Sequence, residues 1–421
     1  MDTKYYFLTS LFPNEIYQNI IESSKGAIAN ANNEFQWSLV SGLIKYCANI
    51  SLINFPNVGA YPLKYKYPYM NGSDISNQEK KIGHSYSFIN IIYIKHFLKY
   101  LKILQVLKNE ISSSNKLQEH VIFVYDLYPP FLKALTVIKD NYTDRDIHIC
   151  LVVPDINGMT GNKRNIFSDY IFRRDCKTIS SAYEKVDSFV LLSKHMTDFV
   201  PVGNKPWTVV EGVLNIDKIK KIDKKISDVA LLKNIQLDKN HNKIFYSGAI
   251  DERNGVLSLM ESFKLITNKD FKLIICGDGP LRSLVEKYAR EDKRVIYLGQ
   301  LPNEYIISLQ SKVDLLVNPR LPGQVFTKYS FPSKTIEYFS SGTPTLMYRL
   351  EGVPEEYFNH CFVVENKDNM PVAEGLKQKI IEIFELSEAF RNNIANSAKD
   401  FVINSKSSDY QCKKIFELVS R

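Results

Sequence analysis

The sequence has 421 residues, of which 44% are hydrophobic and 24% are charged. This composition is that of an ordinary globular protein and excludes a disordered or fibrous chain, while the length allows two or three domains. The formal net charge of +8 divides equally between the two halves of the chain. A surplus spread this evenly suits an anionic ligand or an anionic membrane surface, and it argues against nucleic acid as a partner.

The six cysteines are scattered, without a Cys-x-x-Cys pair and without histidine at metal-ligand spacing. We therefore expect a reduced compartment, no metal site and no cofactor. No apolar run approaches the roughly 20 residues that a membrane span needs. The first residues enter a probable strand without the apolar region of a signal peptide. These features predict a cytoplasmic protein that at most lies on the inner face of the cytoplasmic membrane.

The first half of the chain predicts a Rossmann-like domain over residues 1–214, because apolar runs alternate with amphipathic stretches. The expected strands are Tyr5–Leu8, Val121–Tyr125, His148–Val153 and Ser188–Leu192.

Two aspartates follow directly on strands of this half, Asp126 and Asp155. Ligands bind beyond the carboxyl ends of parallel strands, so both carboxylates are candidates for a binding or catalytic role. The simpler alternative is that each one caps the turn that follows it. Of the histidines, only His84 and His195 deserve the same consideration, and a structural role is the simpler interpretation of both.

Residues 91–106 carry Lys95, Lys99 and Lys102 at four- and three-residue spacing opposite an apolar face. This spacing predicts an amphipathic helix with a basic face, and a helix that rests on a membrane is one interpretation of it. A helix packed on the sheet, with its lysines in solvent, would have the same pattern. Both interpretations place the lysines on the outer face.

Between residues 215 and 242 the alternation of apolar runs and amphipathic stretches is lost. This stretch is rich in Lys and Asp, and we interpret it as a linker. A second Rossmann-like domain follows over residues 243–403, and a last amphipathic helix over 408–421 is expected to pack back on the first domain. The expected strands of the second domain are Lys243–Ile250, Phe271–Cys276, Val295–Leu298, Asp314–Asn318, Pro344–Tyr348 and Cys361–Val364.

The most informative stretch, residues 329–344, reads Tyr-Ser-Phe-Pro-Ser-Lys-Thr-Ile-Glu-Tyr-Phe-Ser-Ser-Gly-Thr-Pro. It predicts a helix that opens at Pro332, with the backbone N–H groups of Ser333 and Lys334 pointing out of its start as an anion site. Glu337, one turn on, is placed to accept hydrogen bonds from vicinal hydroxyls. An ordinary helix start with complementary charges is the alternative.

Two glycine-rich turns precede this stretch, each after a predicted strand. The first runs from Gly248 to Gly255 and carries Arg253, and the second is Gly277-Asp278-Gly279-Pro280. Each is common by itself, but three such turns in one parallel sheet converge on one crevice.

These turns, Leu298-Gly299 and the 329–344 stretch resemble, in order and spacing, the retaining glycosyltransferases of group 1 (family 4). The resemblance covers about residues 243–365, and residues 329–338 are similar to the branch that builds bacterial surface polysaccharides. It implies the GT-B fold: an α/β protein whose two Rossmann-like domains face each other across a cleft. The first domain would bind the acceptor and the second the nucleotide sugar.

The resemblance also implies roles for individual residues. Glu337 would be the second glutamate of the Glu-x7-Glu motif, which holds the nucleotide ribose, whereas Tyr329 stands where the first glutamate is expected. Ala249 and Asn254 replace the usual cations of the first turn. The diphosphate then depends on Arg253, Arg320 and Lys334. The full predicted donor site comprises Gly248, Arg253, Gly277, Asp278, Gly279, Leu298, Arg320, Ser333, Lys334 and Glu337.

The implied function is transfer of a hexose or hexose derivative from a nucleotide sugar, favoured as a UDP sugar, to a glycan or polyprenyl-linked acceptor. Asp155 would engage the acceptor hydroxyl, and Lys334 would stabilise the departing diphosphate. Fixed N–H groups and cations can do this without a metal. The alternative, suggested by Tyr329, is a catalytically silent protein that binds nucleotide sugars.

Overall fold

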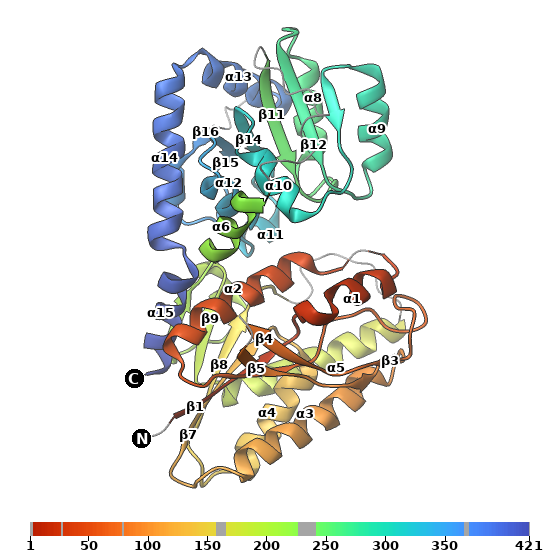
Figure 1. The fold of residues 1–421 in the computed structure, drawn as a ribbon, viewed down its shortest axis with the longest axis vertical. Helices are drawn as coiled ribbons and strands as arrows, with labels where there is room; N and C mark the ends of the chain where they lie inside the picture. The colour runs from red at the N-terminus through yellow and green to blue at the C-terminus, as the bar shows by residue number, and fades with distance from the viewer. Residues whose placement is uncertain are drawn as a thin grey trace. The chain divides into compact units, whose positions relative to one another are not determined.

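The computed structural model describes residues 3–26, 28–77, 80–156, 166–225, 241–365 and 370–420 (Figure 1). The chain divides into two compact units. Unit 1 comprises Met1–Glu211 and Ser408–Arg421, and unit 2 comprises Gly212–Ser407.

Unit 1 is built on an eight-stranded sheet in the order β10-β9-β8-β7-β1-β2-β5-β4. The strands pair in parallel, except that β4 runs antiparallel to β5. Four of them, β1, β7, β8 and β9, coincide with the strands expected from the sequence. The bounds are β1 Thr3–Thr9, β2 Ser51–Asn54, β4 Ser73–Asn77, β5 Lys80–Ser85, β7 Glu119–Tyr125, β8 Ile147–Val153, β9 Ser188–Leu191 and β10 Trp207–Val209.

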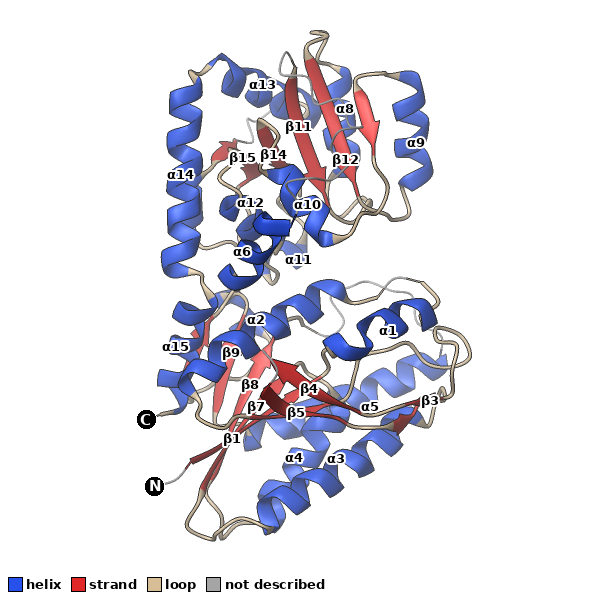
Figure 2. Ribbon diagram, in the orientation of Figure 1, coloured by secondary structure: helices blue, strands red, loops and turns tan. Residues whose placement is uncertain are grey.

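Helices flank this sheet on both sides (Figure 2). A separate two-stranded ribbon is formed by β3 (Tyr69–Met70) and β6 (Phe88–Ile89). The helices of unit 1 are α1 Tyr17–Ser23, α2 Asn30–Tyr46, α3 Lys95–Ser112, α4 Pro129–Asn141, α5 Ile166–Ala182 and α15 Ser408–Val419, with short 3-10 helices η1 Asn14–Ile16, η2 Tyr183–Lys185 and η3 Lys194–Asp198.

The last helix, α15, packs tightly on α2. A Cβ atom on Gly42 of α2 would lie 2.2 Å from the carbonyl oxygen of Ser408, so the two backbones approach too closely for any larger residue there. The Cys412 thiol donates to the carbonyl of Leu39. The C-terminal segment is thus an integral part of the core of unit 1.

Helix α3 corrects the interpretation of residues 91–106. The helix begins at Lys95, and both Lys95 and Lys99 are buried rather than on the outer face. The Lys99 Nζ donates to the carbonyl of Pro56 and lies 3.8 Å from the centre of the Phe88 ring. A buried ammonium group is tolerated only when such partners replace its water, which spacing along the sequence cannot show.

Unit 2 is built on a six-stranded parallel sheet in the order β13-β12-β11-β14-β15-β16. Its strands are nearly continuous apolar runs because both faces are covered. Ile244 and Tyr246 pack into one core cluster and Phe245 into the other, on opposite faces. The bounds are β11 Asn242–Ser247, β12 Phe271–Cys276, β13 Val295–Tyr297, β14 Leu315–Asn318, β15 Thr345–Tyr348 and β16 Phe362–Val364.

The first stretch of unit 1 ends at Glu211, three residues before the boundary predicted at Leu214. Leu214 itself is buried in the core of unit 2. The predicted linker, 215–242, contains helix α6 (Ile216–Lys225), and residues 226–240 lie outside the described residues. The other helices of unit 2 are α8 Val256–Lys264, α9 Arg282–Glu291, α10 Asn303–Gln310, α11 Val325–Lys328, α12 Lys334–Ser340, α13 Val372–Glu385, α14 Glu388–Ser405 and the 3-10 helix η4 Glu355–His360.

Candidate active site

The strand order of unit 2 reverses between β11 and β14, which lie side by side at the centre of the sheet. The chain proceeds outward from β11 through β12 to β13, and outward on the other side from β14 through β15 to β16. Ligands bind at such a switch point, where the loops after the two central strands diverge. The candidate site is therefore formed by residues 248–255 after β11 and 319–333 after β14.

These two loops are in van der Waals contact through Gly255. This residue has φ +75°, and a Cβ atom there would lie 1.9 Å from the carbonyl oxygen of Pro319. Only glycine satisfies both the backbone conformation and the close approach. Gly255 thus fixes the spacing between the loop that carries Arg253 and the loop that carries Arg320.

The turns after β11 and β12 are joined in the same way. Gly277 has φ +142°, and its Cβ atom would lie 1.9 Å from the carbonyl oxygen of Gly248. The Ile250 N–H donates to the carbonyl of Asp278, and the Gly277 N–H donates to that of Gly299. The predicted glycines 248, 277 and 279 therefore hold three successive loops together at the carboxyl edge of the sheet.

Two arginines converge on the ring of Phe326. The Arg253 guanidinium lies 4.3 Å from the ring centre and that of Arg320 lies 5.6 Å from it. Arg320 Nη2 donates to Oδ1 of Asn254 at 2.9 Å. Asn254, which by the resemblance stands in place of a usual cation, therefore orients an arginine. The geometry concentrates two positive charges at the switch point.

Arg320 is the more unusual of the two arginines. Burial lowers its pKa, and the Arg253 charge adds to this effect. Its Nε is buried and has no hydrogen-bond partner among the described residues. A buried guanidinium normally satisfies all its donors, so an open donor at this point is suited to an oxygen-rich anion.

Lys334 and Glu337 lie together at the start of α12. The Lys334 Nζ contacts both carboxylate oxygens of Glu337, at 3.1 and 3.3 Å, and Nε2 of Gln310 donates to the same carboxylate. The sequence predicted that the helix opens at Pro332, but the α-helix begins at Lys334. Pro332 instead accepts a hydrogen bond from the N–H of Thr335, which makes Pro332 and Ser333 a turn that leads into the helix.

Tyr338 fixes α12 to the end of β11, a role that the sequence did not reveal. Its buried hydroxyl accepts from the N–H of Ser247 at 2.9 Å and donates to the carbonyl of Ser247 at 3.2 Å. At the next strand, the Asn318 side chain donates to the Thr335 hydroxyl. These bonds set the position of Lys334 and Glu337 relative to the arginine loops. The only available signal was the place of Tyr338 directly after Glu337.

The other predicted donor residues have contacts that are typical of turns and of the core. Asp278 accepts a hydrogen bond from the N–H of Gly279 and lies 3.9 Å from Arg282, so its observed partners are those of a turn. Leu298 packs against the core and Ser333 is exposed. Tyr329, at the place of the first family glutamate, is buried, and the Lys328 ammonium lies 5.3 Å from its ring centre.

In unit 1, Asp126 and Asp155 stand at the carboxyl ends of the adjacent strands β7 and β8. Each carboxylate accepts a hydrogen bond from the next N–H, of Leu127 and Ile156 respectively, as in a capped turn. Asp126 also has φ +75°. Burial, with a smaller contribution from the nearby Asp155 charge, raises its pKa to about 6. A strained, buried carboxylate at a strand end marks a candidate functional site.

The two histidines considered at the outset have structural partners. Nδ1 of His84 lies 2.8 Å from Asp74, on the antiparallel β4–β5 pair. His195 donates its backbone N–H to the hydroxyl of Ser193 at the start of η3.

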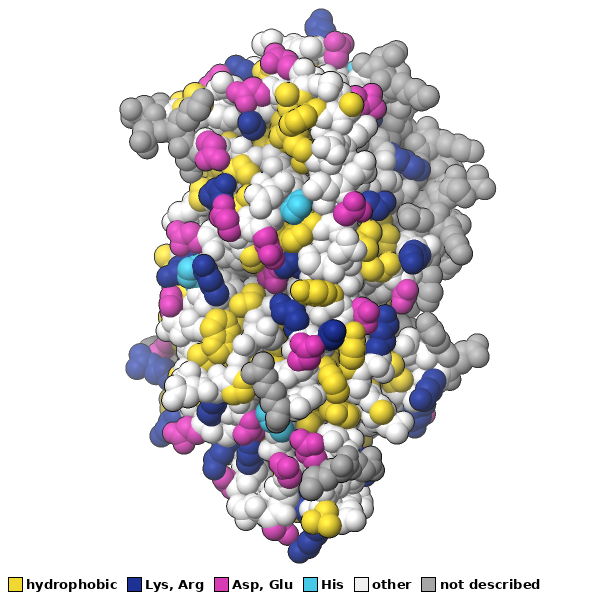
Figure 3. Space-filling model, turned by 90° about the vertical axis from the view of Figure 1, so that its left-hand side faces the viewer, with side chains coloured by type: hydrophobic (Ala, Val, Ile, Leu, Met, Phe, Trp, Pro, Cys, Tyr) yellow, Lys and Arg dark blue, Asp and Glu magenta, His cyan; other side chains and the backbone are white. Residues whose placement is uncertain are grey.

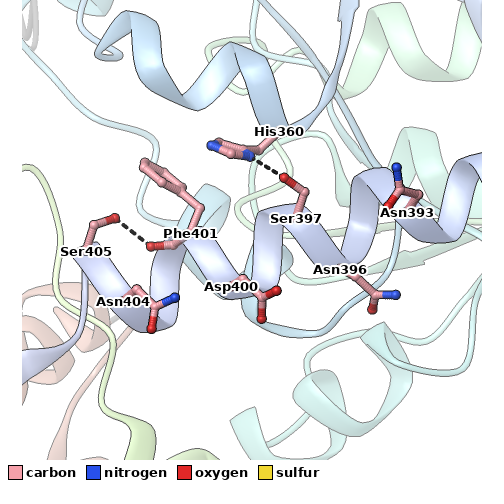
Figure 4. Close-up of a pocket in the computed structure, with 8 residues that line it drawn as sticks. All are labelled: His360, Asn393, Asn396, Ser397, Asp400, Phe401, Asn404 and Ser405. Carbon is pink, nitrogen blue, oxygen red and sulfur yellow. Dashed lines mark hydrogen bonds between the residues drawn. The ribbon is translucent and has the colours of Figure 1, made fainter.

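A cavity of about 440 Å³ lies along α14, apart from the switch-point loops (Figure 4). His360 of η4 donates to or accepts from the Ser397 hydroxyl there and stacks on Phe401. None of the predicted site residues lines this cavity. Its lining consists of His360, Asn393, Asn396, Ser397, Asp400, Phe401, Asn404 and Ser405.

The described residues contain no group of three or more His, Cys, Asp or Glu side chains that could hold a metal ion. Within the same residues, no helix is both long and apolar enough to cross a membrane.

The second half of the chain is similar in sequence to known glycosyltransferases. Residues 241–385 match the family described as Glycosyl transferases group 1. Over 147 residues the chain is 28% identical to N-acetyl-alpha-D-glucosaminyl L-malate synthase of Bacillus anthracis. That match covers 32% of this chain and 34% of the relative, about a third of its length.

Solved structures match over nearly the whole chain. Sucrose-phosphate synthase from Thermosynechococcus elongatus shares the fold over 99% of this chain and 98% of its own, with a TM-score of 0.66 and 14% identity. The Anabaena HepE protein, solved in complex with UDP, does so over 99% and 100%, with a TM-score of 0.62 and 14% identity. The α/β fold with parallel sheets expected for a GT-B glycosyltransferase is confirmed, and the family match supports group 1 as its class.

Proposed function

We propose that this protein transfers a hexose or hexose derivative from a nucleotide sugar, with retention of the anomeric configuration, as an enzyme of family 4. The single observation that carries the proposal is that Arg253 and Arg320, on the two loops of the switch point in unit 2, share the ring of Phe326. Lys334 begins the helix that follows the second of these loops. The direct test is a panel of nucleotide sugars, with release of the free nucleotide as the measured product.

The chemistry follows from where charge develops. As the glycosidic bond to the donor breaks, negative charge accumulates on the departing diphosphate. Cations and N–H groups that are already in place stabilise this charge without reorganising, which makes such electrostatic support the largest common contribution to catalysis. Arg320, with its open Nε, and Arg253 would hold the diphosphate, and Lys334 would neutralise charge as it forms.

A UDP donor is favoured by two of the structural relatives, which were solved with UDP and with UDP-2-fluoro glucose. In this site Glu337 would accept hydrogen bonds from the two ribose hydroxyls. Lys334 and Gln310 hold the carboxylate at the helix start.

The role of Glu337 can be separated from that of an ordinary helix-start carboxylate. The wild type should bind UDP about tenfold more tightly than 2′,3′-dideoxy-UDP, because the dideoxy form leaves the carboxylate without its donors. Glu337→Gln should weaken UDP binding and narrow this preference, as measured by calorimetric titration. The matched control is Glu374→Gln, which breaks the equivalent i,i+3 pair with Lys377 on α13. If Glu337→Gln lowers the melting temperature and leaves the ribose preference intact, its role is structural.

We further propose that the reaction needs no divalent metal, since the charges that balance the diphosphate are supplied by side chains. Turnover should be unchanged in excess EDTA and should not rise when Mg²⁺ or Mn²⁺ is added. A loss of turnover in EDTA that Mn²⁺ restores would contradict the assignment of the arginines and Lys334.

The acceptor is proposed to bind at the carboxyl edge of the unit 1 sheet. There Asp155 and Asp126, at the ends of neighbouring strands, would together orient the attacking hydroxyl. We propose a glycan or polyprenyl-linked acceptor in capsule, O-antigen or exopolysaccharide assembly, with the enzyme in the cytoplasm. Because one structural relative was solved with glucose-6-phosphate, the acceptor panel should also include sugar phosphates.

The rival proposal is a catalytically silent protein that binds nucleotide sugars, which Tyr329 suggests because it stands in place of a glutamate. Slow hydrolysis of the donor in the absence of acceptor separates the two. A transferase releases free nucleotide at a rate that falls in the Arg320 and Lys334 variants, whereas a binder releases none.

A further inference from the structure

One surface of unit 1 exposes an unusual density of large apolar side chains. We define the apolar surface by its exposed members, which are Leu63, Tyr67, Tyr69, Ile89, Tyr93, Ile94, Phe97 and Leu101. Tyr93 is 69% exposed and Phe97 is 59% exposed. Single exposed apolar residues are normal, but a concentration of eight within 39 residues of sequence, Leu63 to Leu101, marks an interaction site.

Backbone hydrogen bonds join the segments that carry these side chains. Tyr69 of β3 pairs with Ile89 of β6, so their side chains project from the same face of the ribbon. Just outside the ribbon, Tyr61 and Ile91 form a parallel bridge. The chain then enters α3, which packs against β6. The ribbon, the 61–68 loop and the first turns of α3 thus form one continuous surface.

The first turns of α3 are inverted relative to an ordinary surface helix. Lys95 and Lys99 point inward, where their Nζ atoms donate to the carbonyls of Val58 and Pro56. Phe97 and Leu101, which lie on the other side of the helix, point outward. In water the opposite arrangement is favoured, because lysine is almost never fully buried and an aromatic ring gains from burial. The inversion is what a helix needs when its outer face meets an apolar medium.

The segments that carry the apolar surface contribute charge of one sign. Residues 55–73 and 88–109 contain no aspartate or glutamate, while Lys64 and Lys66 are exposed next to Leu63 and Tyr67. Another face of the molecule, seen in Figure 3, shows basic and acidic side chains intermingled. An apolar surface whose own segments supply lysines and no carboxylate is complementary to an anionic lipid bilayer, where each lysine near the surface adds to binding.

We propose that the apolar surface of unit 1 inserts into the interfacial layer of an anionic membrane. Phe97, Leu101 and Ile94 enter the boundary of the acyl chains, and the tyrosines lie at the level of the headgroups, where amphipathic rings are favoured. Lys64 and Lys66 contact lipid phosphates. This inference deepens the proposed function by naming the surface that would bring the enzyme to a lipid-linked acceptor, and it depends on none of the donor-site residues.

The test is flotation of the full-length protein with vesicles of phosphatidylcholine, with and without 30% phosphatidylglycerol (roughly the share of anionic lipid that gives a strong surface potential). Wild type should float with the anionic vesicles. Phe97→Ser/Leu101→Ser should bind them about tenfold more weakly or worse. The matched control is Leu117→Ser/Leu284→Ser, which removes two exposed leucines elsewhere and should float like wild type.

Charge is tested separately. Lys64→Gln/Lys66→Gln should lower binding to anionic vesicles by about 25-fold, or fivefold for each lysine. Binding to pure phosphatidylcholine should change little. In a Phe97→Trp variant, the added tryptophan emission should shift to shorter wavelength when anionic vesicles are mixed in, which reports insertion directly.

Three outcomes would overturn the inference. The protein stays with the unbound fraction at all lipid concentrations, the emission of Phe97→Trp does not move, or Phe97→Ser/Leu101→Ser instead abolishes a concentration-dependent dimer seen by sedimentation velocity. Donor hydrolysis in lipid-free buffer should be equal in all these variants. A failure of vesicle binding with intact hydrolysis therefore contradicts only this inference, and a failure of hydrolysis contradicts only the proposed function.

Discussion

Replacing Arg320 by glutamine is expected to lower the affinity for UDP by about 100-fold, the largest effect of any single change at the donor site. Arg320 carries a partly buried charge whose Nε has no hydrogen-bond partner among the residues that the structure describes, and a diphosphate oxygen would both satisfy this donor and balance the charge. Glutamine retains a side-chain donor for Asn254, so the loop geometry should survive. Calorimetric titration with UDP, with the melting temperature recorded alongside, measures the effect.

The matched control for Arg320 is Arg282→Gln in the same unit. Arg282 is an exposed arginine of α9 that pairs with Glu286, and its loss should leave UDP affinity unchanged. If Arg320→Gln binds UDP as wild type does, the open donor is a feature of packing and the diphosphate lies elsewhere.

Replacing Asp126 by asparagine is expected to make the protein more stable at pH 8 while lowering transfer to the acceptor. The folded pKa of Asp126 is raised from 3.8 to about 6, so ionising it costs more in the folded than in the unfolded state. Its contribution to stability is therefore lost as the pH rises from about 4 through 6. Asparagine removes that cost, keeps an acceptor for the Leu127 N–H and tolerates φ +75°. The gain at pH 8 is at most about 3 kcal/mol.

The pH dependence of the stability difference identifies the Asp126 carboxylate as its cause. Denaturant unfolding of Asp126→Asn and wild type should give equal stability near pH 3.5 and diverge as the pH rises to 7. Transfer should fall by about 100-fold if the carboxylate orients the acceptor hydroxyl. Asp144→Asn, at an exposed turn of the same unit, is the control and should show neither effect. If Asp126→Asn is more stable but fully active, Asp126 acts only as a turn residue.

Much of unit 2 could be predicted because its strands and turns are determined by residues that are adjacent in the sequence. Strands such as Phe271–Cys276 are buried on both faces and read as unbroken apolar runs between glycine-rich turns. The loop that carries Arg253 follows such a strand directly, so topology alone places it at the carboxyl edge of the sheet. Arg320, the second residue of the loop after β14, entered the prediction only through the resemblance, as a cation available to the diphosphate.

What could not be predicted depends on contacts between distant parts of the chain. The burial of Lys99 requires the Pro56 carbonyl, 43 residues away, and the anchoring role of Tyr338 requires Ser247, 91 residues away. The strand β2 has only four residues and follows a helix without a clear turn signal. Its place beside β1 is set by pairing rather than by its own sequence pattern.

The assignment of α15 to unit 1 determines how the gene can be divided. Unit 1 is assembled from two separate stretches of chain, so a fragment that ends near Glu211 would encode a unit without its last helix. The face of α2 around Leu39 and Gly42 would then be open to water, and such a fragment would be prone to aggregation. A stable version of this unit for separate study has to carry residues 408–421 as a fused segment, whereas unit 2 can be cut out as one continuous piece.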